Sequence, residues 1–554
     1  MIAKKLGINR DVKLYFYLVL LIGSISQLAL IFPSGLFRNG KVQFWGAQFH
    51  DGLWHVSVAQ KIKDLSLENP VYSGETIQNY HILTDFFLAF ISKFTGISLL
   101  HVTYRILPLI MTIALGVLTF VLVSRIFKSQ KAAVWSMFFV YMGSNLAYIL
   151  PYFGLGYDIW ETTLWLQQPM SMFFNLPLAT SLPFIFLAII TLKSYLEKGS
   201  RKYFVYSVIL FAILPAIKSH SIIFLVALGI VGIWWALIKR KYDVLLLSVS
   251  AFILAAAIIS PTFDFGNHLI FEPGWFLRTM IEAPDRMNWK DWALRYQFYK
   301  AHNNTLHLIR FFGVAFTIFF IGNLGTRVIA IFGIPKLKKL ITDEINLLLI
   351  ISAIFSVSIP MFFLTTNVAW NSIQFSYYYL FIAGIYSGVG MYKLVSKIKN
   401  SKIKLLFVLI TVSLTIPVNI HTLWYYYSRP TSSVIKGEHL EALQKLSNAG
   451  ATSDVILNLP AGSDAIEVAA FTGKSMFLGD WAQAVVPGHD HKARLDLLTE
   501  AMQNDEDFIK LLKKYGINWI YIKGSSPEIV SDIGGMVSEF YISDKIKVYH
   551  VEEN

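Results

Sequence analysis

Asp51 is the residue whose type and position most clearly indicate chemistry. It follows His50, precedes Trp54 and His55, and comes soon after the first long apolar segment. A carboxylate held at the mouth of a helical bundle can take a proton from an attacking hydroxyl group, which is general base catalysis. The alternative is a helix cap, because Asp is favoured at N-caps and a helix can begin at Gly52. We expect Asp51 to be a catalytic base, and His50 and His55 to orient it, contact phosphate or be solvated.

Tyr80, His81 and Asp85 form a second polar group, at the start of an expected helix. His81 and Asp85 are four positions apart and would share a helix face, so they could hydrogen-bond and line a pocket. A helix with an ordinary solvated face is the alternative.

A third group of candidates consists of carboxylate and amide side chains. Glu161 and Gln168 lie in the aromatic segment 157–169, while Asn371 and Gln374 begin a later apolar segment. Aromatic faces with carboxylates and amides suit a sugar. Tyr and Trp also belt membrane interfaces, and amides also join helices, so these alternatives remain open.

Cations that could meet a lipid phosphate occur at two places. Lys218 and His220 lie between two apolar segments with almost no loop, and Arg278 and Arg286 lie in the segment 267–300 together with His268. The alternative for Lys218 is that its ammonium group only reaches the membrane interface.

The elements that must position these residues are membrane spans. The hydrophobic fraction is 55%, against about 45–50% in soluble domains, and the apolar residues occur in long blocks. Charge at mid-bilayer is costly, so spans are read as nearly charge-free runs. About eleven are expected, at 14–32, 105–127, 132–150, 171–194, 204–217, 220–238, 243–260, 308–330, 345–364, 374–395 and 403–420.

The net charge of +13 reflects topology rather than nucleic-acid binding, because Lys and Arg lie mostly between alternate spans. The positive-inside rule then predicts a multi-pass plasma-membrane protein with a cytoplasmic N-terminus and an extracytoplasmic C-terminal domain. For this topology to hold, the segment 80–96, interrupted by Asp85 and Lys93, must be an interfacial helix rather than a span. The chain has no cysteine, which excludes disulfides.

Two domains are expected. Residues 1–430 form the membrane domain, whose first outer loop, 33–104, holds two interfacial amphipathic helices at 53–66 and 80–97. Residues 431–554 contain no span, and helical runs alternate there with strand-like runs, which predicts a small α/β domain. The expected strands are 454–459, 475–478, 517–523 and 545–551, and the expected helices are 437–448, 464–471 and one or two within 493–515.

Two common catalytic motifs are absent from the sequence. It contains neither GxxxxGK[ST] nor HExxH, which excludes ATP hydrolysis through a P-loop and the commonest zinc protease. No cofactor is predicted with certainty, and the identity of any metal ligands is unknown.

These features resemble the GT-C superfamily, polytopic glycosyltransferases that use polyprenyl-phosphate sugars as donors. In that superfamily an acidic residue in the first outer loop is the base, and Asp51 matches it. The two interfacial helices, with Tyr80-His81 opening the second and Arg105–Pro108 opening the next span, are similar to those of protein O-mannosyltransferases and aminoarabinose transferases. The stretch Arg494–Lys523 resembles the tail of uncharacterised members. Several relatives carry two adjacent acids and this chain carries one, so a divalent metal ion and the acceptor type stay open.

The resemblance implies sugar transfer from a polyprenyl-phosphate donor to an extracytoplasmic hydroxyl with inversion. The acceptor would be a glycan, lipid or protein of unknown identity, and nucleic acid would not be a partner. Lys218, Arg278 and Arg286 are the candidate cations for the departing phosphate. A transporter or flippase of lipids or lipid-linked sugars is the alternative, and a non-enzymatic envelope assembly protein is another.

Overall fold

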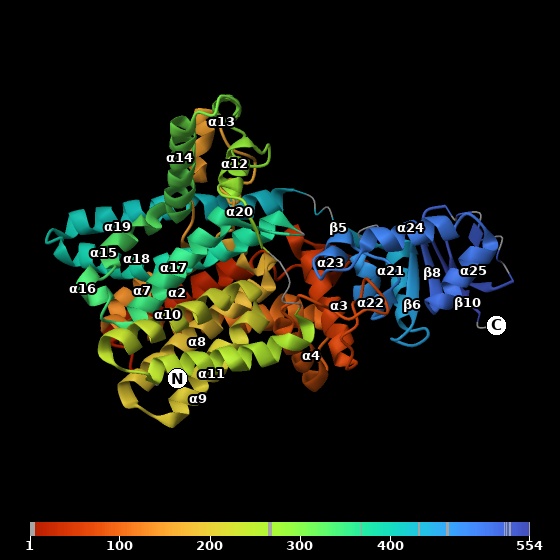
Figure 1. Cartoon of the computed structure of the whole chain (residues 1–554), viewed down its shortest axis with the longest axis horizontal. Coiled ribbons are helices and arrows are strands. Elements are labelled where there is room, and N and C mark those ends of the chain that lie inside the picture. Colours follow the sequence, from red (N-terminus) through yellow and green to blue (C-terminus); the bar gives the residue numbers. More distant parts are fainter. Residues whose placement is uncertain are drawn as a thin grey trace. The chain divides into compact units, whose positions relative to one another are not determined.

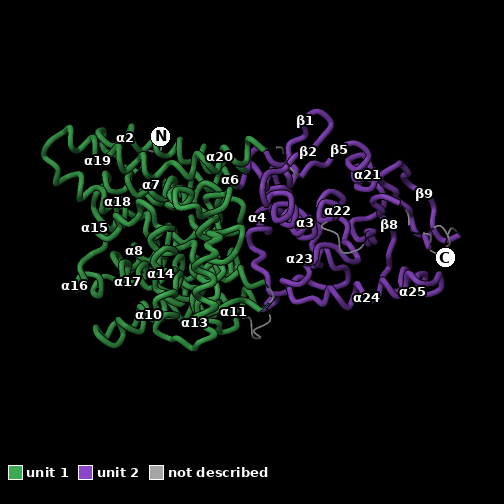
Figure 2. Tube along the Cα trace, turned by 90° about the horizontal axis from the view of Figure 1, so that it is seen from above, with its two compact units in different colours: residues 1–30, 108–259, 265–429 green, residues 31–107, 260–264, 430–554 purple. Residues whose placement is uncertain are grey.

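The computed structural model describes residues 6–263, 269–366, 368–429, 431, 433–460, 465–525, 527, 529–530, 533 and 535–552. The chain forms two compact units (Figure 2). We call residues 1–30, 108–259 and 265–429 the helical unit, and residues 31–107, 260–264 and 430–554 the mixed unit. The segment expected to be the first outer loop is therefore grouped with the C-terminal residues.

Long helices dominate the helical unit, because its apolar runs are separated by short polar turns (Figure 1). Its elements are α2 (Arg10–Leu28), α6 (Leu107–Phe127), α7 (Gln130–Met142), η3 (Ala147–Phe153), η4 (Pro169–Phe174), α8 (Leu176–Lys198), α9 (Arg201–Ile217), η5 (Ser219–Ser221), α10 (Ile222–Lys239), α11 (Asp243–Ile259), β3 (Leu269–Phe271), α12 (Trp275–Glu282), α13 (Lys290–Ala301), α14 (Thr305–Leu324), η7 (Gly325–Ile329), α15 (Ala330–Gly333), α16 (Leu337–Leu340), α17 (Glu344–Phe362), β4 (Phe363–Thr365), η8 (Ala369–Ser376), α18 (Tyr377–Lys397), α19 (Ser401–Thr415) and α20 (Pro417–Ser428).

The prediction of a polytopic helical membrane protein is confirmed. Within the described residues, eight helical segments are long and apolar enough to cross a membrane, and α7 with η3, bent by 52°, makes a ninth. The two remaining expected spans, 204–217 and 374–395, coincide with α9 and α18, which are helical but are not among those eight.

Small residues let the helices of this unit approach closely. Gly384 and Gly388 of α18 face α7, and a Cβ atom at Gly388 would lie 2.0 Å from the backbone nitrogen of Ser136. The Ser136 hydroxyl donates a hydrogen bond of 2.7 Å to the carbonyl of Ile385. Glycines four residues apart are a common contact between membrane helices, because they remove the side chains that would separate two backbones.

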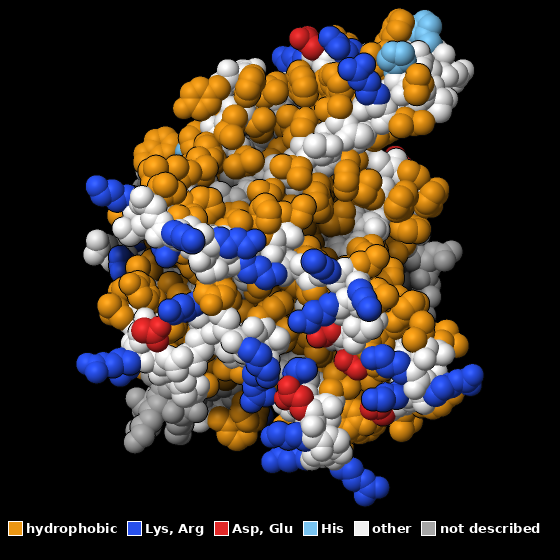
Figure 3. All heavy atoms as spheres, turned by 90° about the vertical axis from the view of Figure 1, so that its left-hand side faces the viewer, with side chains coloured by type: hydrophobic (Ala, Val, Ile, Leu, Met, Phe, Trp, Pro, Cys, Tyr) orange, Lys and Arg blue, Asp and Glu red, His pale blue; other side chains and the backbone are white. Residues whose placement is uncertain are grey.

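Basic side chains gather at one end of the helical unit. Figure 3 shows the side on which the turns next to α9, α15, α16 and α19 lie, where Lys and Arg are abundant and acidic side chains are few. This distribution agrees with the expected alternation of basic and non-basic loops. The side of the membrane that this end faces stays a prediction.

The mixed unit combines the segment 31–107 with the C-terminal residues. Its elements are β1 (Leu36–Arg38), β2 (Lys41–Phe44), η1 (Gly46–Gln48), α3 (Asp51–Lys63), α4 (Leu83–Thr95), α5 (Leu99–His101), η2 (Val102–Ile106), η6 (Ser260–Thr262), β5 (Ser433–Lys436), α21 (Gly437–Ser447), β6 (Val455–Leu459), α22 (Ile466–Thr472), β7 (Ser475–Met476), α23 (Trp481–Val485), α24 (His491–Ala501), α25 (Asp505–Lys514), β8 (Ile517–Lys523), β9 (Val537–Ile542) and β10 (Ile546–Val551).

A five-stranded mixed sheet organises the C-terminal residues, in the order β7-β6-β8-β10-β9. Strand β6 is parallel to both β7 and β8, whereas β10 is antiparallel to β8 and β9. The predicted α/β character is confirmed, and β8 has the predicted bounds. Strand β9 was not predicted, and Asp464 of the predicted helix 464–471 lies outside the described residues.

Backbone hydrogen bonds join the segment 31–107 to the C-terminal residues. Strand β2 pairs antiparallel with β5, with Val42 opposite Ile435. The Ser73 amide donates to the Met476 carbonyl at 2.9 Å, next to β7. The C-terminal residues are therefore folded onto the segment that carries Asp51.

Helix α3 differs from the expected amphipathic interfacial helix. Nearly all of it from Gly52 to Ile62 is buried, and it packs against α4 and α22 within the mixed unit. The C-terminal residues supply a second surface that covers this helix, and its place at the membrane interface stays a prediction.

Candidate functional site

Asp51 and His50 are brought together with Asp480, a residue from the C-terminal part of the mixed unit. The Nδ1 atom of His50 lies 2.7 Å from Oδ1 of Asp51, and its Nε2 atom lies 2.7 Å from Oδ2 of Asp480. The Asp51 side chain is 48% exposed, whereas that of Asp480 is 1% exposed. One imidazole thus links a half-exposed carboxylate to a buried one.

The charges around His50 determine its protonation. Burial opposes the protonated ring, but the hydrogen bonds and negative charges of Asp480 and Asp51 outweigh it and raise the pKa of His50 to about 10. His50 is therefore an imidazolium at neutral pH, and both of its N–H groups donate to carboxylates. This arrangement fixes the direction of the Asp51 carboxylate.

Local structure explains how the three residues are held. Asp480 is the N-cap of α23, and its Oδ1 atom accepts a hydrogen bond of 2.8 Å from the Gln483 amide. At the other end, Gly52 allows α3 to lie against Tyr104, because a Cβ atom there would be 2.4 Å from the Tyr104 hydroxyl.

The structure does not support the capping alternative for Asp51. Asp51 is the first residue of α3, and its hydrogen bond goes to His50 rather than to a helix amide. His50 occupies the N-cap position and caps no amide with its side chain. Among the described residues, no group of three or more His, Asp or Glu side chains is placed to hold a metal ion, so the question of metal dependence stays open.

His55, Asp85 and Tyr80 form a second, buried cluster in the mixed unit. The Nδ1 atom of His55 lies 2.7 Å from Oδ1 of Asp85 and 3.1 Å from the Tyr80 hydroxyl. Burial raises the pKa of the Asp85 carboxyl, although contact with His55 opposes this. His81 precedes α4 and stacks on Tyr80 at 4.6 Å, so the predicted helical pair of His81 and Asp85 was wrong: His55 takes the place of His81.

Glu161 and Gln168 are adjacent in the helical unit but face its interior. Glu161 is 1% exposed, and its Oε1 atom accepts hydrogen bonds from the Gln168 amide at 2.8 Å and the Ser171 hydroxyl at 2.6 Å. Burial raises the pKa of Glu161 to about 7, although these hydrogen bonds oppose the rise. Direct contact between Glu161 and a sugar in a surface pocket is therefore not supported.

Arg327 is a buried cation beside this pair. Its guanidinium donates to the Gln168 side chain and to the carbonyls of Asn323 and Leu324, and its Nη1 atom has no hydrogen-bond partner among the described residues. Arg327 is 0% exposed and lies within the candidate span Thr305–Gly333. The expectation of nearly charge-free spans was wrong here, because carbonyls and an amide solvate the guanidinium.

Lys218, His220, Asn371 and Gln374 come together in the helical unit. The Nε2 atom of His220 lies 2.8 Å from the Asn371 carbonyl, and the Gln374 side chain donates to that of Asn371 at 3.0 Å. Asn175 donates to Gln374 at 2.9 Å. Lys218, 4% exposed, immediately precedes the turn η5 that contains His220. The predicted amides and cation thus lie in one polar cluster, of which Asn175 was not predicted.

Arg278 and Arg286 have acidic neighbours. Arg278 lies 3.9 Å from both Glu272 and Glu282, and Arg286 contacts Asp285 at 2.8 Å. Nearby carboxylates partly balance their charges, and their role as phosphate ligands stays a prediction. His268, from the same predicted region, lies outside the described residues.

Asp480 and Arg327 were the main omissions of the sequence reasoning. Asp480 lies 430 positions from His50 in the chain, and no local pattern connects the two. Arg327 did carry a signal, since a charged residue within an apolar span is a functional or structural candidate by itself.

Comparison with known proteins identifies solved structures that share the fold of this chain. No family model matches the sequence, and no curated protein matches it. Among solved structures, archaeal oligosaccharyltransferase AglB from Archaeoglobus fulgidus, in complex with an inhibitory peptide and a dolichol-phosphate, aligns with a TM-score of 0.52 and 11% identity over 93% of this chain and 70% of its own. The Archaeoglobus fulgidus oligosaccharyltransferase tethered with an acceptor peptide aligns with a TM-score of 0.51 and 14% identity. This alignment covers 92% of this chain and 69% of its own.

The mycobacterial arabinofuranosyltransferase AftD aligns over 98% of this chain and 42% of its own, with 11% identity, but its TM-score of 0.48 is too low to add to the argument. At these identities the likeness to AglB is a likeness of fold alone. The chain therefore shares the fold of this archaeal membrane oligosaccharyltransferase.

Proposed function

We propose that this chain is a membrane glycosyltransferase. It moves a sugar from a polyprenyl-phosphate donor to a hydroxyl acceptor with inversion, and Asp51 is the general base. The N-terminus is cytoplasmic, and the mixed unit with its C-terminal residues lies on the extracytoplasmic side of the plasma membrane.

The observation that carries this proposal is the contrast within the Asp51–His50–Asp480 group. Oδ1 of Asp51 is held by His50, which is anchored on the buried Asp480, while 48% of the Asp51 side chain is exposed. A carboxylate that is fixed through one oxygen and still half exposed can accept a hydrogen bond from an incoming hydroxyl group. Such positioned bases contribute about 10²–10⁴-fold to a rate.

The proposed step is a single displacement at the anomeric carbon. The acceptor oxygen attacks as Asp51 takes its proton, a new carbon–oxygen bond forms, and the bond from the anomeric carbon to the phosphate oxygen breaks. The electron pair leaves with the polyprenyl phosphate. Phosphate is a weakly basic leaving group, so no general acid is required; attack opposite the leaving group inverts the anomeric centre.

Of the predicted cations, Lys218 is the best candidate to stabilise the departing phosphate. Arg278 and Arg286 have carboxylate neighbours at 3.9 Å and 2.8 Å, whereas Lys218 is 4% exposed and lies beside His220, whose ring contacts the Asn371 carbonyl. A cation in a water-poor site stabilises developing negative charge more strongly than one in water. The dolichol-phosphate bound to AglB is a phosphate-linked isoprenoid, which supports a donor of this class.

One observation favours the alternative of a lipid or lipid-linked-sugar flippase. Arg327 is fully buried within a candidate span, and buried charge in membrane helices often marks a transport path. The third possibility, a non-enzymatic envelope assembly protein, has no such observation in its favour.

The test uses the full chain, purified and reconstituted in liposomes with a radiolabelled polyprenyl-phosphate sugar and a panel of hydroxyl acceptors. We expect label to move to an acceptor, and the product to have inverted anomeric configuration. Movement of the donor between leaflets without transfer would instead favour a flippase. Retained turnover in Asp51→Asn would exclude Asp51 as the base.

A further inference from the structure

Two cavities of the helical unit adjoin and share a wall. The first, about 630 Å³, is lined by Val412, Ser413, Ile416, Pro417 and Ile420 with Trp160, His421 and Trp424. The second, about 570 Å³, shares Trp160, His421 and Trp424 and is lined also by the loop 154–158, Pro151, Pro284, Asn288 and Arg429. Because three residues line both cavities, the two are neighbours, and we refer to the pair as the depression.

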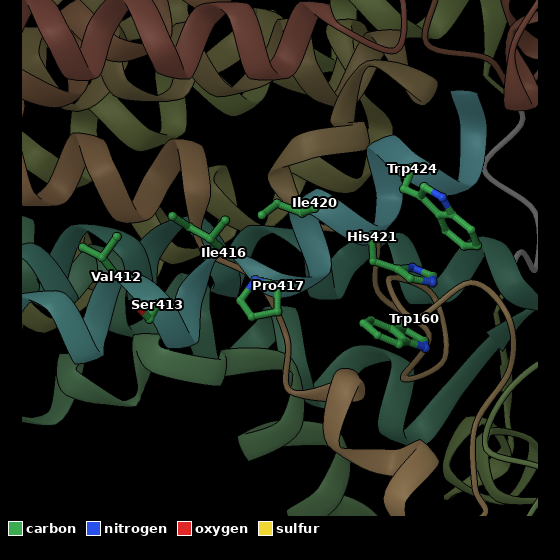
Figure 4. A pocket seen from close by; sticks show the side chains of 8 residues that line it. All are labelled: Trp160, Val412, Ser413, Ile416, Pro417, Ile420, His421 and Trp424. Carbon is green, nitrogen blue, oxygen red and sulfur yellow. The ribbon is translucent and has the colours of Figure 1, made fainter. Parts of the chain in front are cut away.

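The two compartments differ in chemistry. Figure 4 shows the aliphatic side chains of the first compartment at one end and Trp160, His421 and Trp424 at the other. In the second compartment, Arg429 contacts Asp158 at 2.9 Å and lies over the Tyr425 ring at 4.1 Å. We call the first the apolar groove and the second the polar pocket.

The apolar groove lies on a segment that faces away from the protein core. It is formed along α19 and α20, which together make the candidate span Ser401–Ser428, and only 22% of that span's most apolar window is buried. Ile420 is 61% exposed. In a membrane, this groove is accessible to a hydrocarbon chain from the bilayer.

The polar pocket has the groups that bind a saccharide. Trp424 is 61% exposed and presents an aromatic face, and the Asp158 and Arg429 side chains, 67% and 49% exposed, offer acceptors and donors for hydroxyl groups. Because the two charges balance, the pocket favours a neutral hydroxylated headgroup over a strongly anionic one. Asn288 supplies a further amide.

The shared aromatic wall is rigidly supported from behind. Trp160 and His421 are stacked at 3.8 Å with an interplanar angle of 11°. Asn145 donates to the carbonyls of Trp160 and Glu161, at 3.3 Å and 2.7 Å. The backbone at Trp160 and Glu161 is thus anchored by Asn145, which holds Trp160 at the junction of the two compartments.

We propose that this depression binds a lipid-linked saccharide, with the hydrocarbon chain in the apolar groove and the sugar in the polar pocket against Trp424. The inference rests on the proposed function only for the bound molecule's role as a substrate, since binding here does not require Asp51. Because the charges of Asp158 and Arg429 balance, the occupant that we assign is a neutral, phosphate-free glycolipid rather than a phosphate-linked sugar donor.

The experiment measures photolabelling of the full chain in phosphatidylcholine nanodiscs. The probe is dodecyl β-glucoside carrying a diazirine in its chain, and dodecanol with the same diazirine is the sugar-free probe. We expect the glucoside to label the stretch 412–429, and Ile420→Trp, which fills the groove, to reduce this labelling about tenfold. Trp424→Ala should reduce it about fivefold, the size expected for one aromatic contact.

Matched variants control for general effects. Leu406→Trp adds the same side chain on α19 outside the groove, and Trp234→Ala removes a partly exposed tryptophan from α10; both should label like the natural chain. Competition with unlabelled farnesyl-phosphoryl glucose and with dodecyl glucoside tests the charge of the occupant. Stronger competition by dodecyl glucoside supports the neutral glycolipid, and stronger competition by farnesyl-phosphoryl glucose would overturn that assignment.

Two further results would overturn the proposal: equal labelling by the sugar-free probe, which means an ordinary membrane lipid, or labelling unchanged by both Ile420→Trp and Trp424→Ala. The variant Asp51→Asn distinguishes failure of this binding site from failure of the proposed catalytic function. Labelling that persists in this variant, with or without sugar transfer by the natural chain, supports the binding site independently of the catalytic role.

Discussion

Asp51 and Glu161 are both carboxylates in segments next to apolar spans, yet their surroundings differ. Asp51 is half exposed and contacts a histidine that a second carboxylate keeps protonated. Glu161 is buried, its partners Gln168 and Ser171 are neutral, and its pKa rises to about 7. The position of an acid relative to a span therefore does not decide its role. The role depends on the charge of the acid's partners and on the exposure of its side chain.

The largest expected effect comes from replacing each of the two carboxylates by the corresponding amide and comparing the rates of sugar transfer. Asp51→Asn should lower sugar transfer by about 10²–10⁴-fold, because the amide cannot take a proton. Glu161→Gln should keep most of the turnover, since an amide can still accept from Gln168 and Ser171. Initial rates per folded molecule in liposomes measure both. Equal losses in the two variants would remove the distinction between a reactive and a structural acid.

The second prediction concerns stability. Glu161→Leu leaves the buried Gln168 amide and Ser171 hydroxyl without their acceptor, at about 1–3 kcal/mol for each unsatisfied group. We expect the free energy of unfolding in mixed micelles to fall by a few kcal/mol, about 2–6 by this count. Glu161→Gln is the matched control and should unfold near the natural chain. An unchanged free energy of unfolding in Glu161→Leu would show that the hydrogen bonds of Glu161 do not stabilise the folded chain.

Asp480→Asn tests the positioning role of the buried carboxylate. The amide can still cap α23, but the charge on Nε2 of His50 is lost, so the pKa of His50 should fall from about 10 toward its ordinary value. We expect turnover to fall about tenfold, which is less than the loss of about 10²–10⁴-fold expected when the base itself is removed, and its alkaline limit to move to lower pH. A pH–rate profile measures both. The exposed Asp507→Asn, in the same unit, should leave the profile unchanged.

The smallest expected effect is a pH dependence of stability. The folded pKa of His50, about 10, lies above its ordinary value of 6.5, so its ion pairs stabilise the folded chain fully below pH 6.5 and lose this contribution as the pH rises through 10. The effect is modest because one third of the His50 side chain is exposed to solvent. Thermal unfolding between pH 6 and 10 should show a decline that His50→Gln removes. An identical decline in that variant would assign it to other groups.

Local patterns predicted the helices and much of the C-terminal sheet. The β-branched and aromatic run 517–523 forms β8 with the predicted bounds, and the apolar runs form helices, because these signals depend on neighbours in the sequence. Strand β9 was missed, since Val537–Ile542 is exposed at most positions and pairs only at the sheet edge.

The candidate site was predictable only in part. His50 and Asp51 are neighbours in sequence, so their association could be foreseen, whereas Asp480 reaches His50 through a long-range fold contact. Similarly, Asp85 was expected to pair with His81 on one helix, but packing of α3 on α4 brings His55 to it instead. Sequence spacing describes contacts within an element, and tertiary packing decides those between elements.

The link from His50 to Asp480 has a consequence for biosynthesis. A ribosome makes His50 and Asp51 early, and the aspartate that anchors His50 follows 430 positions later in the chain. Nascent chains stalled or cleaved before that point carry the first loop with an untethered imidazole. The anchored arrangement around Asp51 therefore forms late in translation, after the candidate spans of the described residues, the last of which ends at Ser428, have been made.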